Sequence, residues 1–225
     1  TAAMQQLLTG KKRLPGFDGE WKEFQLGDQV DFFKGKSLSK AAIVENAPNK
    51  CIHYGELFTF YPEKITNIQS RTYQDKVDSF LSKENDVLMP TSDVTPNGLA
   101  KASCIQENGV ILGGDILIIR PKEKNKINGV FLSYLIRLFK DEIMKRVSGT
   151  TVYHLYASDL KTFPLWLPSY QEQTAIATIL SDMDNEINTL EQRLAKARSL
   201  KTGMMQELLT GKTRLIKTNK KQEAA

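Results

Sequence analysis

The chain has 225 residues, of which 40% are hydrophobic, 25% charged and 8% aromatic, a composition typical of folded globular proteins rather than of disordered or fibrous ones. Its two cysteines, Cys51 and Cys104, are too few for a disulfide framework and lack the Cys-x-x-Cys spacing of a structural zinc site. Because no signal-peptide pattern is visible and no apolar run approaches the roughly 20 residues that a bilayer requires, we expect a cytoplasmic protein without a membrane segment.

The formal net charge of +5 is concentrated at the two ends of the chain. Residues 1–16 carry three basic and no acidic residues, whereas residues 17–165 carry 19 of each. Residues 166–211 carry four basic and six acidic residues, and residues 212–225 carry five and one. Since the long middle segment is neutral, the overall basicity does not by itself indicate nucleic-acid binding, and any DNA-binding face must be a local patch.

The first recognisable element is one copy of an internal repeat. Residues 4–14, MQQLLTGKKRL, recur as residues 205–215, MQELLTGKTRL, with nine of eleven positions identical. This repetition indicates a single period of a longer repeating protein. We therefore interpret residues 1–16 as the end of a preceding helix with its linker, and a chain that begins with Thr1 rather than Met as a fragment or a half-length form.

The next segment, residues 17–165, is predicted to be rich in strands. Residues 21–26 form the first predicted strand, and residues 86–89 form another that Pro90 ends. The apolar runs at 110–112 and 116–119 flank a Gly-Gly-Asp turn and predict a hairpin.

Helical periodicity then predicts one helix over Val130–Val147, which begins near Asn128 and ends near Gly149. A last buried strand is expected at Phe163–Leu167. The fold class is therefore α+β, a mixed strand-rich domain followed by one long helix that can form a coiled coil.

The long helix occupies residues 166–211, with a basic tail at 212–225. Ser169 and Glu172 have capping-box spacing at its start, and Gly211 suits its end. Apolar residues then recur in steps of four and three, a heptad seam that only Lys201 interrupts. Such a seam either packs on the helix's own domain or pairs with an equivalent helix of another unit. Its members are Ile176, Leu180, Met183, Ile187, Leu190, Leu194, Met204 and Leu208.

A search for catalytic motifs finds none that is complete. Gly35-Lys36-Ser37 and Gly211-Lys212-Thr213 resemble the end of a phosphate-binding loop, but the required earlier glycine is absent from both. His53 and His154 lack Cys or acidic neighbours at metal-ligand spacing. We therefore predict no catalytic residue, no metal site and no cofactor bound by this chain.

Several predicted loops instead carry side chains that contact phosphates and base edges. Lys and Arg contact phosphates or guanine, Asn pairs with adenine, and hydroxyl groups contact either. Gathered on one face, they would read DNA directly. The candidate DNA-binding residues are Lys36, Ser37, Lys40, Asn49, Lys50, Arg71, Thr91, Ser92, Asn97, Lys101, Thr150, Thr151, Tyr153 and His154.

The order of these elements and motifs resembles one known family. The matching motifs are, in chain order, Ser148–Thr151, Phe163–Leu165, Pro168–Gln173 at the start of the long helix, Ile179–Ser181 within it and Leu208–Lys212 at its end. This arrangement closely resembles the specificity subunit of type I restriction-modification systems. The resemblance covers most of the chain.

The resemblance implies a target recognition domain at 17–165 that reads one half of a split DNA site, followed by a conserved spacer and dimerisation helix. In that family the pattern occurs twice, whereas this chain holds one recognition domain. The implied partners are double-stranded DNA, modification subunits, restriction subunits and a second specificity half or a homodimer. S-adenosylmethionine, ATP and Mg²⁺ are expected on the partner subunits.

Two other classes of function remain open at this point. A coiled-coil adaptor would bind a protein through its globular head. A stand-alone DNA methyltransferase would need motifs that this sequence does not show. Specific duplex binding would separate DNA recognition from the adaptor, and S-adenosylmethionine binding without partners would favour the enzyme.

Overall fold

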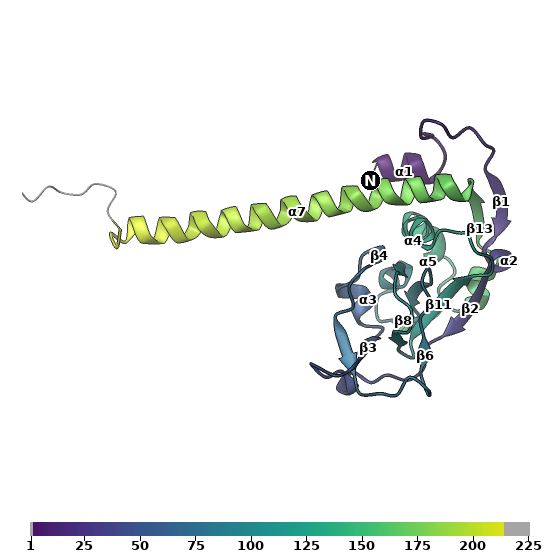
Figure 1. Ribbon diagram of the computed structural model, residues 1–225, viewed down its shortest axis with the longest axis horizontal. Coiled ribbons are helices and arrows are strands. Elements are labelled where there is room, and N and C mark those ends of the chain that lie inside the picture. Colours follow the sequence, from purple (N-terminus) through teal and green to yellow (C-terminus); the bar gives the residue numbers. More distant parts are fainter. Residues whose placement is uncertain (1, 214–225) are drawn as a thin grey trace, which may run out of the picture. The chain divides into compact units, whose positions relative to one another are not determined.

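The computed structural model describes residues 2–213 (Figure 1). It divides the chain into two units, Thr1–Ser181 (unit 1) and Asp182–Ala225 (unit 2). Among the described residues, every strand lies in unit 1, which also contains the first turns of the long helix, and the described part of unit 2 is mainly the rest of that helix.

A five-stranded sheet of order β2-β11-β7-β9-β4 lies at the centre of unit 1. Its middle strands are antiparallel, and their continuous apolar runs are buried on both faces because helices and a second sheet cover them. The parallel pair is β4–β9. The strands are β2 (Val30–Lys34), β4 (Lys64–Ile65), β7 (Val87–Pro90), β9 (Ser103–Ile105) and β11 (Ile116–Pro121).

A second, four-stranded sheet has the order β5-β3-β10-β6. Its members are β3 (Asn49–Ile52), β5 (Ser70–Thr72), β6 (Phe80–Leu81) and β10 (Ile111–Leu112).

The predicted hairpin between 110–112 and 116–119 is wrong. β10 pairs with β3 and β6, whereas β11 pairs with β2 and β7, so the two strands belong to different sheets. Each run is apolar at consecutive residues and is buried between two partner strands, whereas a hairpin with one solvated face would alternate. The Gly-Gly-Asp turn therefore carries the chain from one sheet into the other.

Two short antiparallel pairs complete the strands. β1 (Lys22–Gln25) pairs with β13 (Pro164–Leu167), and β8 (Ser92–Asp93) pairs with β12 (Tyr153–His154). The strands predicted at 21–26 and 163–167 are thus present. β13 is buried on one face only, because its side chains alternate and Trp166 is 54% exposed.

Two helices replace the single helix predicted over Val130–Val147. α4 (Gly129–Leu138) begins where expected, since the Asn128 side chain accepts a hydrogen bond from the Phe131 amide at 3.0 Å. The helix then breaks at Phe139, whose φ of −89° and ψ of 29° are not helical, and α5 (Lys140–Met144) follows. The aromatic ring of Phe139 packs edge-on against Phe163 at 6.2 Å, a tertiary contact that helical periodicity does not encode.

The remaining short helices connect these strands. They are α1 (Ala2–Leu8), α2 (Leu26–Gln29), α3 (Glu56–Thr59), α6 (Ala157–Lys161) and the 3₁₀ turns η1 (Lys40–Ala42) and η2 (Pro96–Ala100). α1 packs on α4, at the end of unit 1 opposite β3 and β6 (Figure 1).

The two faces of the five-stranded sheet enter different hydrophobic cores. Val87, Met89, Leu117 and Ile119 contribute to the main core, which also contains α4 and the start of α7. The alternate residues of β7 and β11 face a second core shared with the four-stranded sheet.

Both cysteines are buried within this framework. Burial raises the pKa of the Cys51 thiol to about 11 and also raises the pKa of Cys104. Both thiols are therefore protonated near neutral pH.

The long helix is α7 (Tyr170–Leu209), which contains 40 residues and is therefore about 60 Å long. The predicted N-cap is confirmed, because the Ser169 hydroxyl accepts a hydrogen bond from the Glu172 amide at 3.3 Å. The helix begins at Tyr170 rather than at residue 166, since residues 166 and 167 pair in β13, and the Glu172 carboxylate accepts hydrogen bonds from Arg13 instead of closing the predicted capping box. The end of the helix is also confirmed, since Gly211 has the left-handed φ of 70°. The basic tail lies outside the described residues from position 214 onward.

The predicted heptad seam has two environments. Ile176 and Leu180 are buried in the main core of unit 1. In unit 2, by contrast, the seam residues Met183, Ile187, Leu190, Leu194 and Met204 are between 41% and 54% exposed. Leu208, the last seam residue, is half-buried. One end of the seam thus packs on its own domain, and most of the rest is exposed in the single chain.

Candidate nucleic-acid interface

Four of the candidate DNA-binding residues meet at one strand pair. Ser92 is paired with His154 across β8 and β12, and Asp93 is paired with Tyr153. The carbonyl oxygen of Thr91 accepts a hydrogen bond from the amide of Leu155 at 3.0 Å. These residues come from segments some 60 positions apart in the sequence, so only the fold brings them together.

A cavity of about 550 Å³ lies beside this strand pair. Phe32 and Leu117 contribute apolar side chains to its lining, whereas Thr91, Ser92 and His154 contribute polar groups. An aromatic wall with a few hydrogen-bonding groups is the usual lining of a ligand or base-contacting recess.

Two further interactions shape this cavity. The imidazole ring of His154 stacks on the ring of Tyr156, with 5.9 Å between the centroids and 20° between the planes. Tyr156 is 53% exposed, so this stack is accessible from solvent. Across the lining, the Lys34 ammonium lies 3.6 Å from the carboxylate of Asp115.

A second group of candidates lies around β3 and β5. Lys36 and Ser37 are exposed on the connection from β2 to η1, and Lys40 is exposed at the start of η1. The Arg71 guanidinium donates to the carbonyl oxygens of Ala47 and Pro48, each at 3.3 Å.

Gln74 ties the loops of this second group together. The side-chain amide of Asn49 donates to the Gln74 carbonyl oxygen at 2.9 Å, and the Gln74 side chain donates to the Ser37 carbonyl oxygen at 3.1 Å. Gln74 therefore links the Ser37 loop to β3, the strand that carries Asn49.

The Gly113–Asp115 turn joins the two groups. A Cβ atom placed on Gly114 would lie 3.5 Å from the Cα atom of Ser37, so the second group contacts the turn closely. On the other side, the Asp115 carbonyl oxygen accepts a hydrogen bond from the Thr91 amide at 3.0 Å. The two groups are thus neighbours, and we call them together the Lys36–His154 surface, whose members are Lys36, Ser37, Lys40, Asn49, Arg71, Thr91, Ser92, Tyr153 and His154.

The other candidate residues have varied surroundings. Asn97 is exposed on η2, which packs on β8 and β12, so it adjoins the Lys36–His154 surface. Lys50 forms an ion pair with Glu107 at 2.8 Å, and Lys101 donates to the Phe58 carbonyl oxygen at 2.9 Å. The charges of these two lysines are partly engaged within the chain. Thr150 and Thr151 are exposed between α5 and β12.

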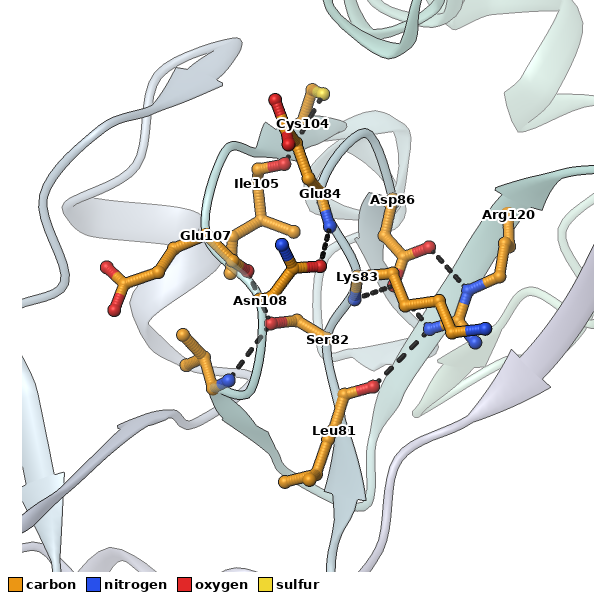
Figure 2. A network of polar contacts seen from close by, with 11 residues as sticks. Leu81, Ser82, Lys83, Glu84, Asp86, Cys104, Ile105, Glu107, Asn108 and Arg120 are labelled. Atoms are coloured by element: carbon orange, nitrogen blue, oxygen red, sulfur yellow. Dashed lines mark hydrogen bonds and ion pairs between the residues drawn. The ribbon is translucent and has the colours of Figure 1, made fainter. Parts of the chain in front are cut away.

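A buried ion pair in unit 1 is not evident from the sequence. Asp86 is fully buried, and its two carboxylate oxygens each accept a hydrogen bond from Arg120 at 2.7 Å (Figure 2). The Arg120 guanidinium also lies over the rings of Phe33 and Phe80, at 5.0 Å and 5.5 Å from their centroids.

The position of Arg120 lets it connect the two sheets. It belongs to β11 of the five-stranded sheet and donates to the carbonyl oxygen of Leu81 in β6 of the other sheet at 3.3 Å (Figure 2). The sequence shows only an arginine after an apolar run and an aspartate before another, with nothing that pairs them.

The described part of the chain shows neither a metal-binding cluster nor a membrane-spanning helix. Within residues 2–213, no three His, Cys, Asp or Glu side chains are grouped so that they could hold a metal ion. Among the helices of the same residues, none is long and apolar enough to cross a membrane.

Comparison with known proteins identifies the family. A sequence model described as the type I restriction modification DNA specificity domain matches residues 18–197. Because this match covers most of the chain, the protein belongs to that family, and the resemblance predicted from its motifs is confirmed.

Two curated relatives come from Methanocaldococcus jannaschii. The type I restriction enzyme MjaVIII specificity subunit is 26% identical over 197 residues, which are 85% of this chain and 42% of that protein. The putative type I restriction enzyme MjaX specificity subunit is 39% identical over 101 residues, or 44% of this chain and 24% of that protein. The chain thus spans less than half the length of these relatives.

Solved structures show the same fold. The S subunit of a type I restriction-modification system from M. genitalium matches with a TM-score of 0.59 and 18% identity, over 87% of this chain and 47% of that one. The HsdS subunit from Thermoanaerobacter tengcongensis matches with a TM-score of 0.57 and 16% identity, over 92% and 49%. These matches confirm the predicted class, a strand-rich mixed domain followed by a long helix.

Proposed function

We propose that unit 1 is a DNA-recognition module of a type I restriction-modification enzyme and that it reads one half of a bipartite site through the Lys36–His154 surface. The observation that carries this proposal is the gathering of base-contacting side chains from well-separated segments onto one surface, in a chain of the DNA specificity family. Because residues 17–165 carry equal numbers of acidic and basic residues, direct readout explains binding better than bulk charge.

The two parts of the surface suit different tasks. Lys36, Lys40 and Arg71 supply positive charge that would position the phosphate backbone. Thr91, Ser92 and His154 surround an aromatic-walled cavity and would contact base edges by hydrogen bonds. Lys50 and Lys101 are engaged within the chain, so their expected contribution is smaller.

We further propose that this chain is non-catalytic. Its sequence lacks a cofactor loop, and its family is named for DNA specificity. In this proposal the chain acts in the cytoplasm and docks modification subunits that carry S-adenosylmethionine, with restriction subunits that use ATP and Mg²⁺. A similar solved structure, with a TM-score of 0.62, concerns complex assembly of the type I restriction-modification system, which supports such docking.

The open part of the heptad seam is proposed to pack against the equivalent helix of a second specificity half or of a second copy. Half-exposed apolar residues at regular heptad spacing along α7 support this pairing.

The test is a binding selection from random duplexes with the full chain, followed by titration of single variants. Replacing Thr91, Asn97, Thr151 or Tyr153 by Ala should weaken binding to the selected duplex by about 1–3 kcal/mol, while binding to random duplexes stays nearly unchanged. Lys36→Ala should weaken both and flatten the salt dependence. The matched control is Lys196→Ala, on the exposed helix of unit 2.

Other outcomes would favour the alternative functions. A chain that selects no duplex sequence but captures one protein through unit 1 would be an adaptor. Stoichiometric S-adenosylmethionine binding by the chain alone, measured calorimetrically, would indicate a methyltransferase. If the polar variants weaken cognate and random binding alike, as is expected only of the lysine variant, the Lys36–His154 surface does not read sequence.

A further inference from the structure

A carboxylate lines the cavity of the Lys36–His154 surface. Asp115 ends the turn that joins the two groups of this surface, and its side chain belongs to the cavity lining beside β8 and β12. An ionised carboxylate can accept hydrogen bonds but cannot donate them, and DNA phosphates repel it. On a surface that binds DNA, Asp115 therefore weakens binding unless it meets a hydrogen-bond donor.

The backbone around Asp115 is held by three strands of the five-stranded sheet. The next residue, Ile116 of β11, lies opposite Pro90 of β7, and its carbonyl oxygen accepts a hydrogen bond from the Gly35 amide at 3.0 Å. Gly35 directly follows β2. The Asp115 carbonyl oxygen accepts a hydrogen bond from the Thr91 amide, also at 3.0 Å. Because strands place functional groups more precisely than loops do, the residue that carries this carboxylate is fixed at the end of the sheet.

The turn before Asp115 lies in close contact with both sheets. A Cβ atom on Gly35 would lie 1.9 Å from the Gly113 carbonyl oxygen, so the chain after β2 passes directly against the turn. On the other side, a Cβ atom on Gly113 would lie 3.2 Å from the carbonyl oxygen of Ile52 in β3. The turn is therefore packed between two strands, and Asp115 keeps its position when a ligand approaches.

The cationic neighbour of Asp115 is weakly attached to it. The Lys34 ammonium lies 3.6 Å from the carboxylate, beyond the usual length of an N–H···O hydrogen bond, and the two side chains are 65% and 48% exposed. Ion pairs with this much exposure contribute little to stability. Lys34 can therefore turn to a phosphate at small cost, which leaves the carboxylate free to accept a hydrogen bond.

Few groups of a DNA duplex can donate to a carboxylate. In the major groove, cytosine presents its N4 amino group and adenine its N6 amino group, whereas guanine O6 and thymine O4 are acceptors. A carboxylate therefore attracts the amino bases and repels the keto bases. The hydroxyl groups of Thr91 and Ser92 in the same lining can donate or accept, so they discriminate less between the two kinds of base.

We propose that Asp115 is a specificity-determining residue whose carboxylate accepts a hydrogen bond from the exocyclic amino group of one cytosine or adenine. This inference rests on the proposed function, because it assigns one base contact to the Lys36–His154 surface. In the complex, Lys34 leaves Asp115 and contacts a phosphate. The acid thus favours an amino base at one position and disfavours every duplex that has a keto base there.

The first experiment compares the selected duplex with random duplexes over a range of salt concentrations. Asp115→Ala in the full chain should weaken binding to the selected duplex about tenfold, because a hydrogen bond to a charged group is lost. The same variant should bind random duplexes more tightly and with a steeper salt dependence, since Lys34 is released for phosphates. The matched control is Asp31→Ala, which removes an exposed acid from β2 that lines a different cavity and should affect both duplexes alike.

Base analogues identify the contact. Each cytosine of the selected half-site is replaced in turn by 2-pyrimidinone, and each adenine by purine, since these analogues lack the exocyclic amino group. One replacement should weaken binding of the unaltered chain about tenfold but should not weaken binding of Asp115→Ala further, because the carboxylate is already absent. Whether that position holds a cytosine or an adenine distinguishes the two sources of the amino group.

A second variant keeps the shape of the side chain. Asp115→Asn can donate as well as accept, so it no longer repels a keto oxygen. The loss caused by thymine in place of the contacted cytosine, or by guanine in place of the contacted adenine, should therefore be smaller for Asp115→Asn than for the unaltered chain. Tryptophan emission checks that each variant is folded, and Asp115→Asn decides the question if Asp115→Ala is not.

Two results would overturn the inference and leave the proposed function standing. The first is that removal of the amino group affects the unaltered chain and Asp115→Ala alike at every position. The second is that Asp115→Asn leaves the loss caused by a keto base unchanged. In both cases the chain still selects a duplex. A chain that selects no duplex sequence overturns the proposed function together with this inference.

Discussion

The two copies of the repeat place nearly the same sequence in two surroundings. Leu8 is 1% exposed and Leu209 is 80% exposed, although each precedes a Thr-Gly pair of the same conformation. Burial in this protein is therefore decided by residues distant in sequence, whereas the shape of the helix end is decided locally.

The distant residues that matter are few. The first copy is fixed by α4, by Trp21 and by Glu172, which is 159 positions away from Arg13. Each contact can be removed from the first copy by a substitution, and the same substitution can be made in the second copy as a control. The difference between the two changes in the free energy of unfolding measures what that contact contributes to stability.

The largest difference is expected for the leucine. Leu8→Ala should lower the free energy of unfolding of unit 1 by about 2–5 kcal/mol, because it leaves a cavity in the main core. Leu209→Ala should change it by less than about 0.5 kcal/mol. Both tryptophans, Trp21 and Trp166, belong to unit 1, so the urea dependence of tryptophan emission follows that unit.

Equal effects at these two positions would contradict the comparison. That result would mean that Leu8 is not held in the core in solution, or that Leu209 is already covered by another chain. Repeating the titration over a range of protein concentrations separates the two, since only the second depends on concentration.

The ion pair should have the next largest effect. Glu172→Gln removes the carboxylate that accepts two hydrogen bonds from Arg13 and should cost about 1.5–3 kcal/mol of unfolding free energy. The control is Glu191→Gln, on the exposed part of α7, which should be neutral. If both variants have the same urea midpoint, the leucines alone hold the first copy.

Much of the fold could be predicted because its signals are local. The repeat itself, the caps at Asn128 and Ser169 and the left-handed Gly211 depend on neighbouring residues. Of the strands, β1, β7, β10, β11 and β13 were predicted from their apolar runs, and the other strands were not predicted individually. The hairpin at Gly113 and the single helix through Phe139 were wrong because tertiary pairing decided both. Sequence periodicity indicates which residues are buried, but it does not indicate which strand pairs with them or which aromatic ring packs against them.

The candidate site shows the same limit. The residue types of the Lys36–His154 surface could be chosen from the sequence, since Lys, Ser, Thr and His follow predicted turns and strand ends. Their adjacency could not, because Ser92 meets His154 only through the pairing of β8 with β12. The pair Asp86 and Arg120 is 34 positions apart and likewise had no sequence signal.

The smallest effect concerns the two glycines. Ala at either position must adopt a left-handed φ, which costs about 1–2 kcal/mol. At Gly211 a Cβ atom meets nothing within 4 Å, whereas at Gly10 it meets Trp21 at 3.2 Å. Gly10→Ala should therefore destabilise unit 1 and shift its tryptophan emission, and Gly211→Ala should do neither, because the strain there only frays the end of α7.

A third variant separates backbone strain from the tryptophan contact. Asn tolerates the left-handed conformation better than Ala but also carries a Cβ atom. Gly10→Asn should therefore recover part of the stability lost in Gly10→Ala while keeping the shifted tryptophan emission, because the contact with Trp21 persists. If Gly10→Asn restores the original emission as well, Trp21 does not lie against Gly10, and the first copy of the repeat is held by the leucines and the ion pair without the indole.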